Sequence, residues 1–266
     1  MRIDSQLIDS HCHLPHKYYK KSTEEVIKEA ARSGVVKLIN IGTSIKESKE
    51  ALEIAEEFDN VFPTVAIYPH SDRKRSITSM EKNLRELLET GKFVAVGECG
   101  IDISNWKGGR SVENQLEIFE LQAKLALEYD LPLIIHNRNG DKEVLEVLEK
   151  YSSQGLDQGL RGVVHCFDSD WEFAQKVLDL GFYISFSAFV TYRNKEALLE
   201  VVKNVPANKF LVETDAPYLP PQEYRGKPNY PKYVKIVAEK VAQVKEKPFE
   251  EVAKYSYENT CALFNL

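Results

Sequence analysis

The stretch LIDSHCH at residues 7–13 decides how the rest of this chain is organised. It begins as a short apolar strand and ends in a His-x-His pair. Side chains two residues apart on a strand point to the same face. We therefore expect His11 and His13 to converge beyond the C-terminal end of the strand, while Cys12 points away. Because neutral imidazole is a common ligand for zinc and similar ions, the pair indicates half of a metal site.

Seven further apolar segments are each followed by a predicted helix. These strands are predicted at 35–41, 61–67, 93–97, 131–136, 160–165, 182–186 and 210–215. Most are near-continuous apolar runs, which is typical of parallel strands that are buried on both faces. Capping boxes at 22–25 and 44–47 open two of the helices, a polar loop is predicted at 152–159, and helices at 233–245 and 249–264 end the chain. Eight such units predict a (β/α)₈ TIM barrel.

The length of 266 residues suits either one barrel or two small domains. Barrels of about 250 residues are common as single units, and no linker or change in composition divides the chain. We therefore predict one domain over residues 1–266. A doubly wound open sheet is the alternative, but no Gly-x-Gly-x-x-Gly turn follows any predicted strand. We expect no organic cofactor.

The composition is ordinary for a globular protein, with 43% hydrophobic and 29% charged residues. No apolar run approaches the roughly 20 residues of a membrane helix, and the N-terminus lacks the apolar region of a signal peptide. We expect a cytoplasmic protein with no membrane partner, as a monomer or weak oligomer. The net charge of −6 disfavours a surface that binds nucleic acid everywhere, but it allows a local basic cleft or a metal centre.

The four cysteines show no CxxC spacing, so we expect no disulfide framework. Cys12, Cys99 and Cys166 each stand next to a candidate metal ligand. Alternation along a strand places each thiol on the face opposite its neighbour. We favour small buried thiols between sheet and helices, and additional zinc ligands are the alternative.

Six potential metal ligands stand at the C-terminal ends of predicted strands, where the active sites of barrels lie. They are His11 and His13 at the end of the first strand, Glu98 at the fourth, His136 at the fifth, His165 at the sixth and Asp215 at the eighth. Any one of them alone has a structural or solvated alternative. Four imidazoles and two carboxylates exceed the needs of one tetrahedral ion. They suit two divalent ions about 3.5–4 Å apart with Glu98 bridging, and zinc, magnesium and manganese remain open.

Such a centre indicates hydrolysis, because two cations bind a water nucleophile and hold both the attacking and the leaving oxygen. Asp215 is the candidate that would orient the water and accept its proton, as ligand and general base. Glu98 and Asp215 are thus the predicted catalytic carboxylates.

Five motifs carry a resemblance that spans nearly the whole chain. They read IDSHCHL at 8–14, GECGID at 97–102, IHNR at 135–138, HCF at 165–167 and ETDAPYL at 213–219. Together they resemble the TatD-type metal-dependent deoxyribonucleases of the amidohydrolase superfamily. The resemblance implies a barrel of the metallo-dependent hydrolase type, a magnesium-dependent DNase that is often a 3′→5′ exonuclease, and the same six residues as metal ligands.

Two segments depart from the family pattern near the mouth of the expected site. Tyr68 stands where the family has the first His of Gly-x-His-Pro-His, whereas His70 is kept. Asp168 and Ser169 replace the Ser/Thr-Gly that usually follows His-Cys-Phe. Neither change removes a predicted metal ligand, so both bear on substrate contacts and rate.

Predicted substrate contacts come from cationic and aromatic side chains near the strand ends. Arg138 shares the face of His136 and has a guanidinium that suits a phosphate. Arg225 and Lys227 lie in a segment that resembles the family's Arg-Gly-Lys-x-Asn loop, with a solvated loop as the alternative. His70 is a candidate phosphate or leaving-group donor, and Tyr68, like Trp106, is a candidate to stack on a base.

Three hypotheses follow for function. The first is a metal-dependent phosphodiesterase that acts on DNA, at single strands or ends. The second is a hydrolase of a small ester, amide or lactone at the same centre, which the cationic loop disfavours. The third is a non-catalytic metal-binding or nucleic-acid-binding protein, which the complete set of ligands disfavours.

Overall fold

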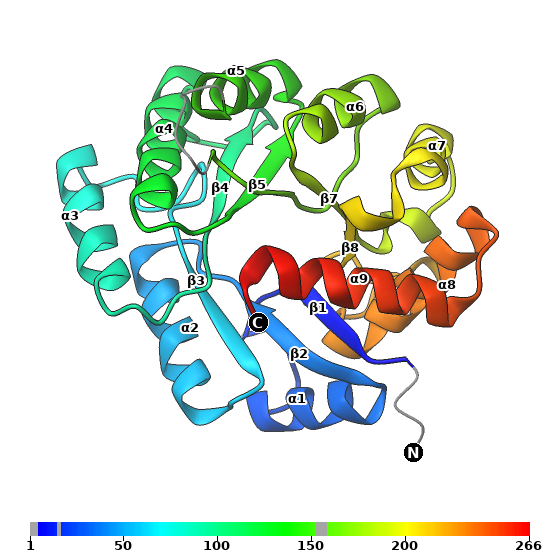
Figure 1. Cartoon of the computed structure of the whole chain (residues 1–266). Helices are drawn as coiled ribbons and strands as arrows, with labels where there is room; N and C mark the ends of the chain where they lie inside the picture. Colours follow the sequence, from blue (N-terminus) through cyan, green and yellow to red (C-terminus); the bar gives the residue numbers. More distant parts are fainter. Residues whose placement is uncertain (1–4, 15–16, 153–158) are drawn as a thin grey trace.

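The computed structural model describes residues 5–14, 17–152 and 159–266 (Figure 1). These residues form an eight-stranded parallel sheet in which the strands follow one another in chain order. The strands are β1 (Leu7–Cys12), β2 (Val35–Asn40), β3 (Val61–Val65), β4 (Ala95–Asp102), β5 (Leu133–Arg138), β6 (Gly162–Val164), β7 (Tyr183–Phe186) and β8 (Phe210–Val212). Asp215 donates its backbone N–H to the carbonyl of His11 over 2.9 Å, which joins the segment after β8 to β1. The predicted (β/α)₈ barrel is therefore confirmed.

Helices alternate with the strands and surround them (Figure 1). They are α1 (Thr23–Arg32), α2 (Ile45–Glu57), α3 (Ile77–Leu88), α4 (Val112–Glu128), α5 (Asp141–Ser152), α6 (Trp171–Asp179), α7 (Glu196–Asn204), α8 (Val234–Lys245) and α9 (Phe249–Phe264). The predicted loop at 152–159 lies almost wholly outside the described residues. None of the helices within the described parts of the chain is long and apolar enough to cross a membrane.

The two capping boxes predicted from the sequence differ in the structure. Ser22 and Glu25 make the complete reciprocal pair at the start of α1. Ser44 caps α2 through the backbone N–H of Glu47, but the Glu47 side chain accepts instead from the hydroxyl of Thr43. The second box is therefore only half formed, because the Glu47 carboxylate bonds the Thr43 hydroxyl and not the backbone of Ser44.

The barrel interior is filled by apolar side chains of the strands and closed by the last helix. Leu263 and Phe264 at the end of α9 pack among them, and α9 runs across the ring of strands in Figure 1. The strand residues of this lumen cluster are Ile8, Ile39, Ala95, Ile134, Val163 and Leu211. Because this end is packed with apolar groups, polar chemistry is left to the opposite, C-terminal ends of the strands.

A second apolar cluster lies between the strands and the surrounding helices. Cys12 and Cys99 belong to it and are fully buried, with their thiols near the carbonyls of Ile39 and Ile134. These two cysteines therefore take the buried structural position that we favoured. Cys166 differs, because it lines the cleft described below and its sulfur lies 3.1 Å from the Ser187 hydroxyl oxygen.

Irregular pairing in β1 and β4 changes which side chains face the barrel interior just before the site. Ile8 points into the lumen, so strict alternation would send Cys12 inward and His11 outward. A register shift between Asp9 and Cys12 changes this order, and Cys12 joins the outer cluster. A shift between Gly97 and Cys99 does the same for Glu98 on β4. An extra residue of this kind re-aims the side chains that follow it.

We expect Phe264→Ala to destabilise the fold, because Phe264 is buried in the lumen cluster at the closed end of the barrel. Removal of a buried phenylalanine ring commonly costs about 3–5 kcal/mol through lost burial and the cavity left behind. Denaturant unfolding monitored by circular dichroism measures this loss. A loss below about 1 kcal/mol would show that α9 does not seal the barrel.

Candidate metal centre

The fold brings all six predicted metal ligands to the C-terminal ends of the strands. His11 lies in β1 and His13 directly after it, while Glu98 and His136 lie within β4 and β5. His165 directly follows β6, and Asp215 comes three residues after β8. Glu98 is 5% exposed and His165 is 4% exposed, so the centre lies below the surface. The sequence-based expectation that these residues meet is therefore met in the structure.

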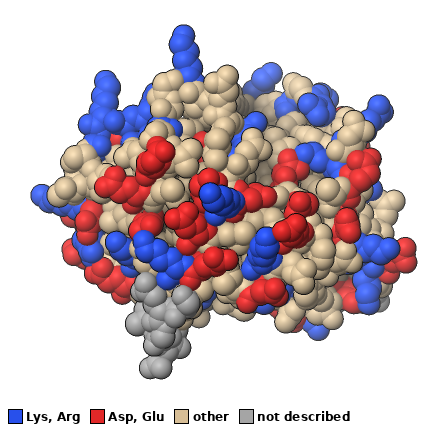
Figure 2. Space-filling model, turned by 90° about the horizontal axis from the view of Figure 1, so that it is seen from above, with Lys and Arg blue, Asp and Glu red and all other residues tan. Residues whose placement is uncertain are grey.

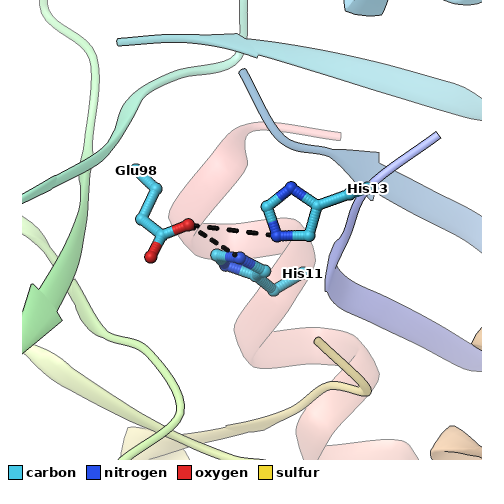
Figure 3. A group of neighbouring side chains, drawn as sticks. All are labelled: His11, His13 and Glu98. Carbon is cyan, nitrogen blue, oxygen red and sulfur yellow. Dashed lines mark ion pairs between the residues drawn. The ribbon is translucent and has the colours of Figure 1, made fainter. Parts of the chain in front are cut away.

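Glu98 stands in the middle of the centre, with two imidazoles at each carboxylate oxygen. Its Oε2 lies 3.4 Å from Nε2 of His11 and 3.9 Å from Nε2 of His13 (Figure 3). Its Oε1 lies 2.8 Å from Nδ1 of His136 and 3.0 Å from Nε2 of His165. One carboxylate thus faces two separate pairs of nitrogen ligands.

Asp215 completes the pair at Oε2 of Glu98. Its Oδ1 lies 3.3 Å from Nε2 of His13 and 3.6 Å from Nε2 of His11. Asp215 adopts a left-handed backbone conformation with φ 56°, which is uncommon for a residue other than glycine. Backbone bonds to His11 and Tyr218, each 2.9 Å long, hold this conformation. The carboxylate is therefore positioned by the chain segment that closes the barrel.

Two further carboxylates stand behind the imidazoles, and we did not predict them as site residues. Oε1 of Glu213 lies 3.3 Å from Nδ1 of His165 and accepts the backbone N–H of Cys166 over 2.7 Å. Oδ2 of Asp102 lies 3.6 Å from Nε2 of His136. Both lie in quoted motifs, and Glu213 shares the inward face with Asp215, two residues later. This alternation is the sequence signal that points to it.

The charged groups in the centre shift one another's pKa values. Burial opposes ionisation of Glu98, yet His165, His11 and His136 together hold its pKa well below the ordinary value. Burial also opposes charge on His165, but Glu98 and Glu213 outweigh it and raise its pKa. For His11, burial and the charge of His165 act in the same direction and lower its pKa.

The donor set fits divalent cations. Two groups of side chains, His11 with His13 and Glu98, and Glu98 with His136 and His165, each offer ligand atoms within 4.8 Å of one another. Both ring nitrogens of His11 are buried and have no hydrogen-bond partner among the described residues. Oε2 of Glu98 lies 3.4 Å from Nε2 without forming a well-aligned hydrogen bond, and a buried imidazole that makes no hydrogen bond is costly in a folded protein. Coordination of a cation by one of these nitrogens would remove part of that cost.

The centre opens into a cleft with a volume of about 1240 Å³. Its walls include Arg138, Arg193 and Arg225 on the side of β5 to β8, and Glu47 and Glu50 of α2. Figure 2 shows basic and acidic side chains interspersed over the face that it presents, with no broad area of one sign. The cationic groups near the centre are therefore a local feature of a chain with a net charge of −6.

The predicted substrate contacts fall into different positions. Arg138, Tyr68 and Arg225 line the cleft. Lys227 is exposed, and it is not among the described residues that line the cleft. His70 is 7% exposed, and its ring nitrogens lie 3.1 Å from the carbonyl of Asp102 and 3.1 Å from the backbone N–H of Arg110. In this arrangement both nitrogens of His70 are engaged by the backbone.

Comparison with protein-family models finds one described as "TatD related DNase", which matches residues 8–265. Among curated proteins, the chain is similar to the uncharacterized metal-dependent hydrolase YabD of Bacillus subtilis, with 36% identity over 98% of this chain and 99% of that protein. It is also 36% identical to the uncharacterized metal-dependent hydrolase YcfH of Escherichia coli, over 98% of this chain and 96% of the relative.

Among solved structures, the chain is similar to YjjV, a TatD homologue from Escherichia coli. The TM-score is 0.90, with 28% sequence identity and coverage of 99% of both chains. The similarity therefore extends over the whole barrel, including the segments that carry the six predicted ligands.

We expect the affinity for a divalent ion to increase as the pH rises from about 6 to 8. Burial disfavours a charge on His13, but the Asp215 carboxylate outweighs burial and raises the pKa of His13 above the ordinary 6.5. At His136, Asp102 and Glu98 outweigh burial in the same way, and its pKa also rises. A histidine must lose its proton to bind a cation, so protons compete more strongly at low pH. Calorimetry with zinc in buffers of different ionisation heat measures the protons released, and affinity independent of pH would contradict the expectation.

Proposed function

We propose that this chain, which belongs to the TatD related DNase family, cleaves phosphodiester bonds in DNA at its carboxylate–histidine centre. The family model and the relatives of matching length make it a metal-dependent hydrolase. The DNA substrate, the number of ions and the roles of single residues belong to the proposal.

The placement of Glu98 carries the proposal. Each of its carboxylate oxygens faces a separate pair of imidazoles, and Asp215 joins the pair formed by His11 and His13. A carboxylate with imidazoles near both of its oxygens would suit a site that holds two cations, which we propose to be zinc, magnesium or manganese. When bound, such ions lower the pKa of a water and neutralise negative charge on a phosphodiester.

The protein contributes a proton acceptor and a fixed geometry. Asp215 is 14% exposed at its side chain, so it lies between the buried ligands and the open cleft. We assign to it the orientation of the attacking water and the acceptance of its proton, for which its position at the cleft floor is suited. Glu213 and Asp102 keep the imidazoles oriented while the charge around them changes.

The side chains that line the cleft favour a substrate that is anionic and extended. Arg138, Arg193 and Arg225 line it, and guanidinium groups bind phosphate oxygens with two parallel hydrogen bonds. Arg225 is also held over the ring of Tyr192, 4.8 Å from the ring centre. We propose that these arginines hold phosphates on either side of the bond that is cleaved.

Exposed aromatic side chains around the mouth of the cleft support a substrate that presents unpaired bases as well as phosphates. The exposed large hydrophobic residues of the described chain all follow the C-terminal ends of strands, namely Tyr18 after β1, Ile103 and Trp106 after β4 and Tyr218 after β8. Exposed rings beside a cationic groove are typical of single-strand binding, because every base has a face that stacks. We therefore propose single strands or frayed ends as the substrate.

Asp215→Ala tests the catalytic role. Loss of the general base and of one ligand should lower the rate of oligonucleotide cleavage by about 10²–10⁴-fold or more, and a chelator should abolish cleavage by the unaltered protein. Cleavage products separated by gel electrophoresis give the rate. Asp179→Ala, at the exposed end of α6, is the matched control and should retain full activity. Undiminished cleavage by Asp215→Ala would rule out the mechanism.

Arg225→Ala tests the anionic substrate. Loss of one charged hydrogen bond should lower kcat/KM for a single-stranded oligonucleotide by about 10–100-fold, while a neutral ester should be little affected. Arg161→Ala is the matched control, because Arg161 precedes β6 at the closed end of the barrel and pairs with Asp130. Equal losses on the oligonucleotide and the ester would instead support a hydrolase of small neutral substrates.

A further inference from the structure

A tyrosine and a carboxylate stand directly behind His136, on the side away from Glu98. The hydroxyl of Tyr68 donates to Oδ2 of Asp102 over 2.6 Å, and its oxygen lies 3.3 Å from Nε2 of His136. Asp102 is 1% exposed. The three groups thus form a short chain that ends on one nitrogen of a predicted metal ligand.

The other donors around Asp102 fix the direction of this chain. Its Oδ1 accepts the backbone N–H of Ser104 over 2.8 Å, and its Oδ2 accepts the indole N–H of Trp106 over 3.0 Å. Asp102 is therefore surrounded by donors and acts as an acceptor. The single hydroxyl proton of Tyr68 is directed to Asp102, and the lone pairs of the Tyr68 oxygen are left to accept a hydrogen bond.

The remaining donor for that oxygen is Nε2–H of His136. Asp102 itself lies 3.6 Å from Nε2, which is too long for a direct hydrogen bond. The other nitrogen, Nδ1, lies 2.8 Å from Oε1 of Glu98 and 3.4 Å from Nε2 of His165. Without a cation, Nδ1 at 2.8 Å would donate its own proton to the Glu98 carboxylate. A cation held by Glu98 and His165 would take the place of that proton, so the neutral imidazole would keep its proton on Nε2 and direct the Nδ1 lone pair at the cation.

We propose that Tyr68 is a positioning residue, which together with Asp102 holds the proton of His136 on Nε2 and makes Nδ1 the atom that binds the metal. Groups that fix the tautomer and orientation of a ligating histidine change metal affinity without touching the ion. The inference rests on the proposed metal centre, and it gives Tyr68 a role other than the substrate contact that the sequence predicts.

The first test compares zinc affinity in the unaltered protein, Tyr68→Phe and Tyr151→Phe by competition with a chromophoric chelator. Tyr151 is the matched control, because its hydroxyl also bonds a carboxylate, Glu120, but in the outer helical layer. We expect affinity to fall by about 10–100-fold in Tyr68→Phe and to stay unchanged in Tyr151→Phe. Unchanged affinity in a folded Tyr68→Phe protein would overturn the inference.

The second test needs no variant at position 68. Nitrogen-15 NMR of the zinc-loaded protein with labelled histidines reports which ring nitrogen carries the proton, and the His136 signals are assigned by their loss in His136→Gln. We expect a protonated Nε2 and a metal-bound Nδ1, and the opposite pattern would overturn the inference even if Tyr68→Phe failed to fold. Failure of the unaltered protein to bind zinc or any other divalent ion would instead count against the metal centre itself.

Discussion

The structure depends on the burial of one carboxylate. Glu98 is 5% exposed, and an isolated charge at such a position would cost several kcal/mol. Four surrounding imidazoles compensate for this cost. Two of them come from the end of β1, and the other two come from the ends of β5 and β6. Because these partners come from three parts of the chain that are far apart in the sequence, the charge is stabilised only when β1, β4, β5 and β6 are assembled in the barrel. The same arrangement that makes Glu98 tolerable places donor atoms at both of its oxygens.

The junction of β8 and β1 both closes the barrel and positions part of the centre. Asp9 is fully buried and accepts hydrogen bonds from the backbone N–H and the hydroxyl of Thr214, over 2.8 Å and 2.6 Å. The next residue, Asp215, is bonded to the carbonyl of His11. A shift at this junction would therefore move Asp215 relative to both histidines of β1.

A second layer of side chains contacts the predicted metal ligands on the side away from Glu98. Glu213 bonds His165, and Tyr68 with Asp102 stands behind His136, so the orientations of these rings are set on both sides. The mouth is built differently, because Arg193, Arg225 and the exposed rings lie in segments that follow the strands, while Arg138 is the last residue of β5. Buried carboxylates thus hold the imidazoles of the centre in place, while arginines line the cleft above it despite the net charge of −6.

The sequence by itself determined the barrel and the positions of the six predicted metal ligands at the ends of its strands, because the apolar strand runs and the polar residues that end them are local features. It did not determine the inward direction of His11 and Glu98, since simple alternation from Ile8 or Ala95 sends both outward. The register shifts that reverse them arise from pairing with neighbouring strands. The bonds of Tyr68 to Asp102, and of His70 to the backbone, were likewise decided only by the tertiary structure, because these partners lie at least 32 residues apart and meet only when β3 and β4 pair.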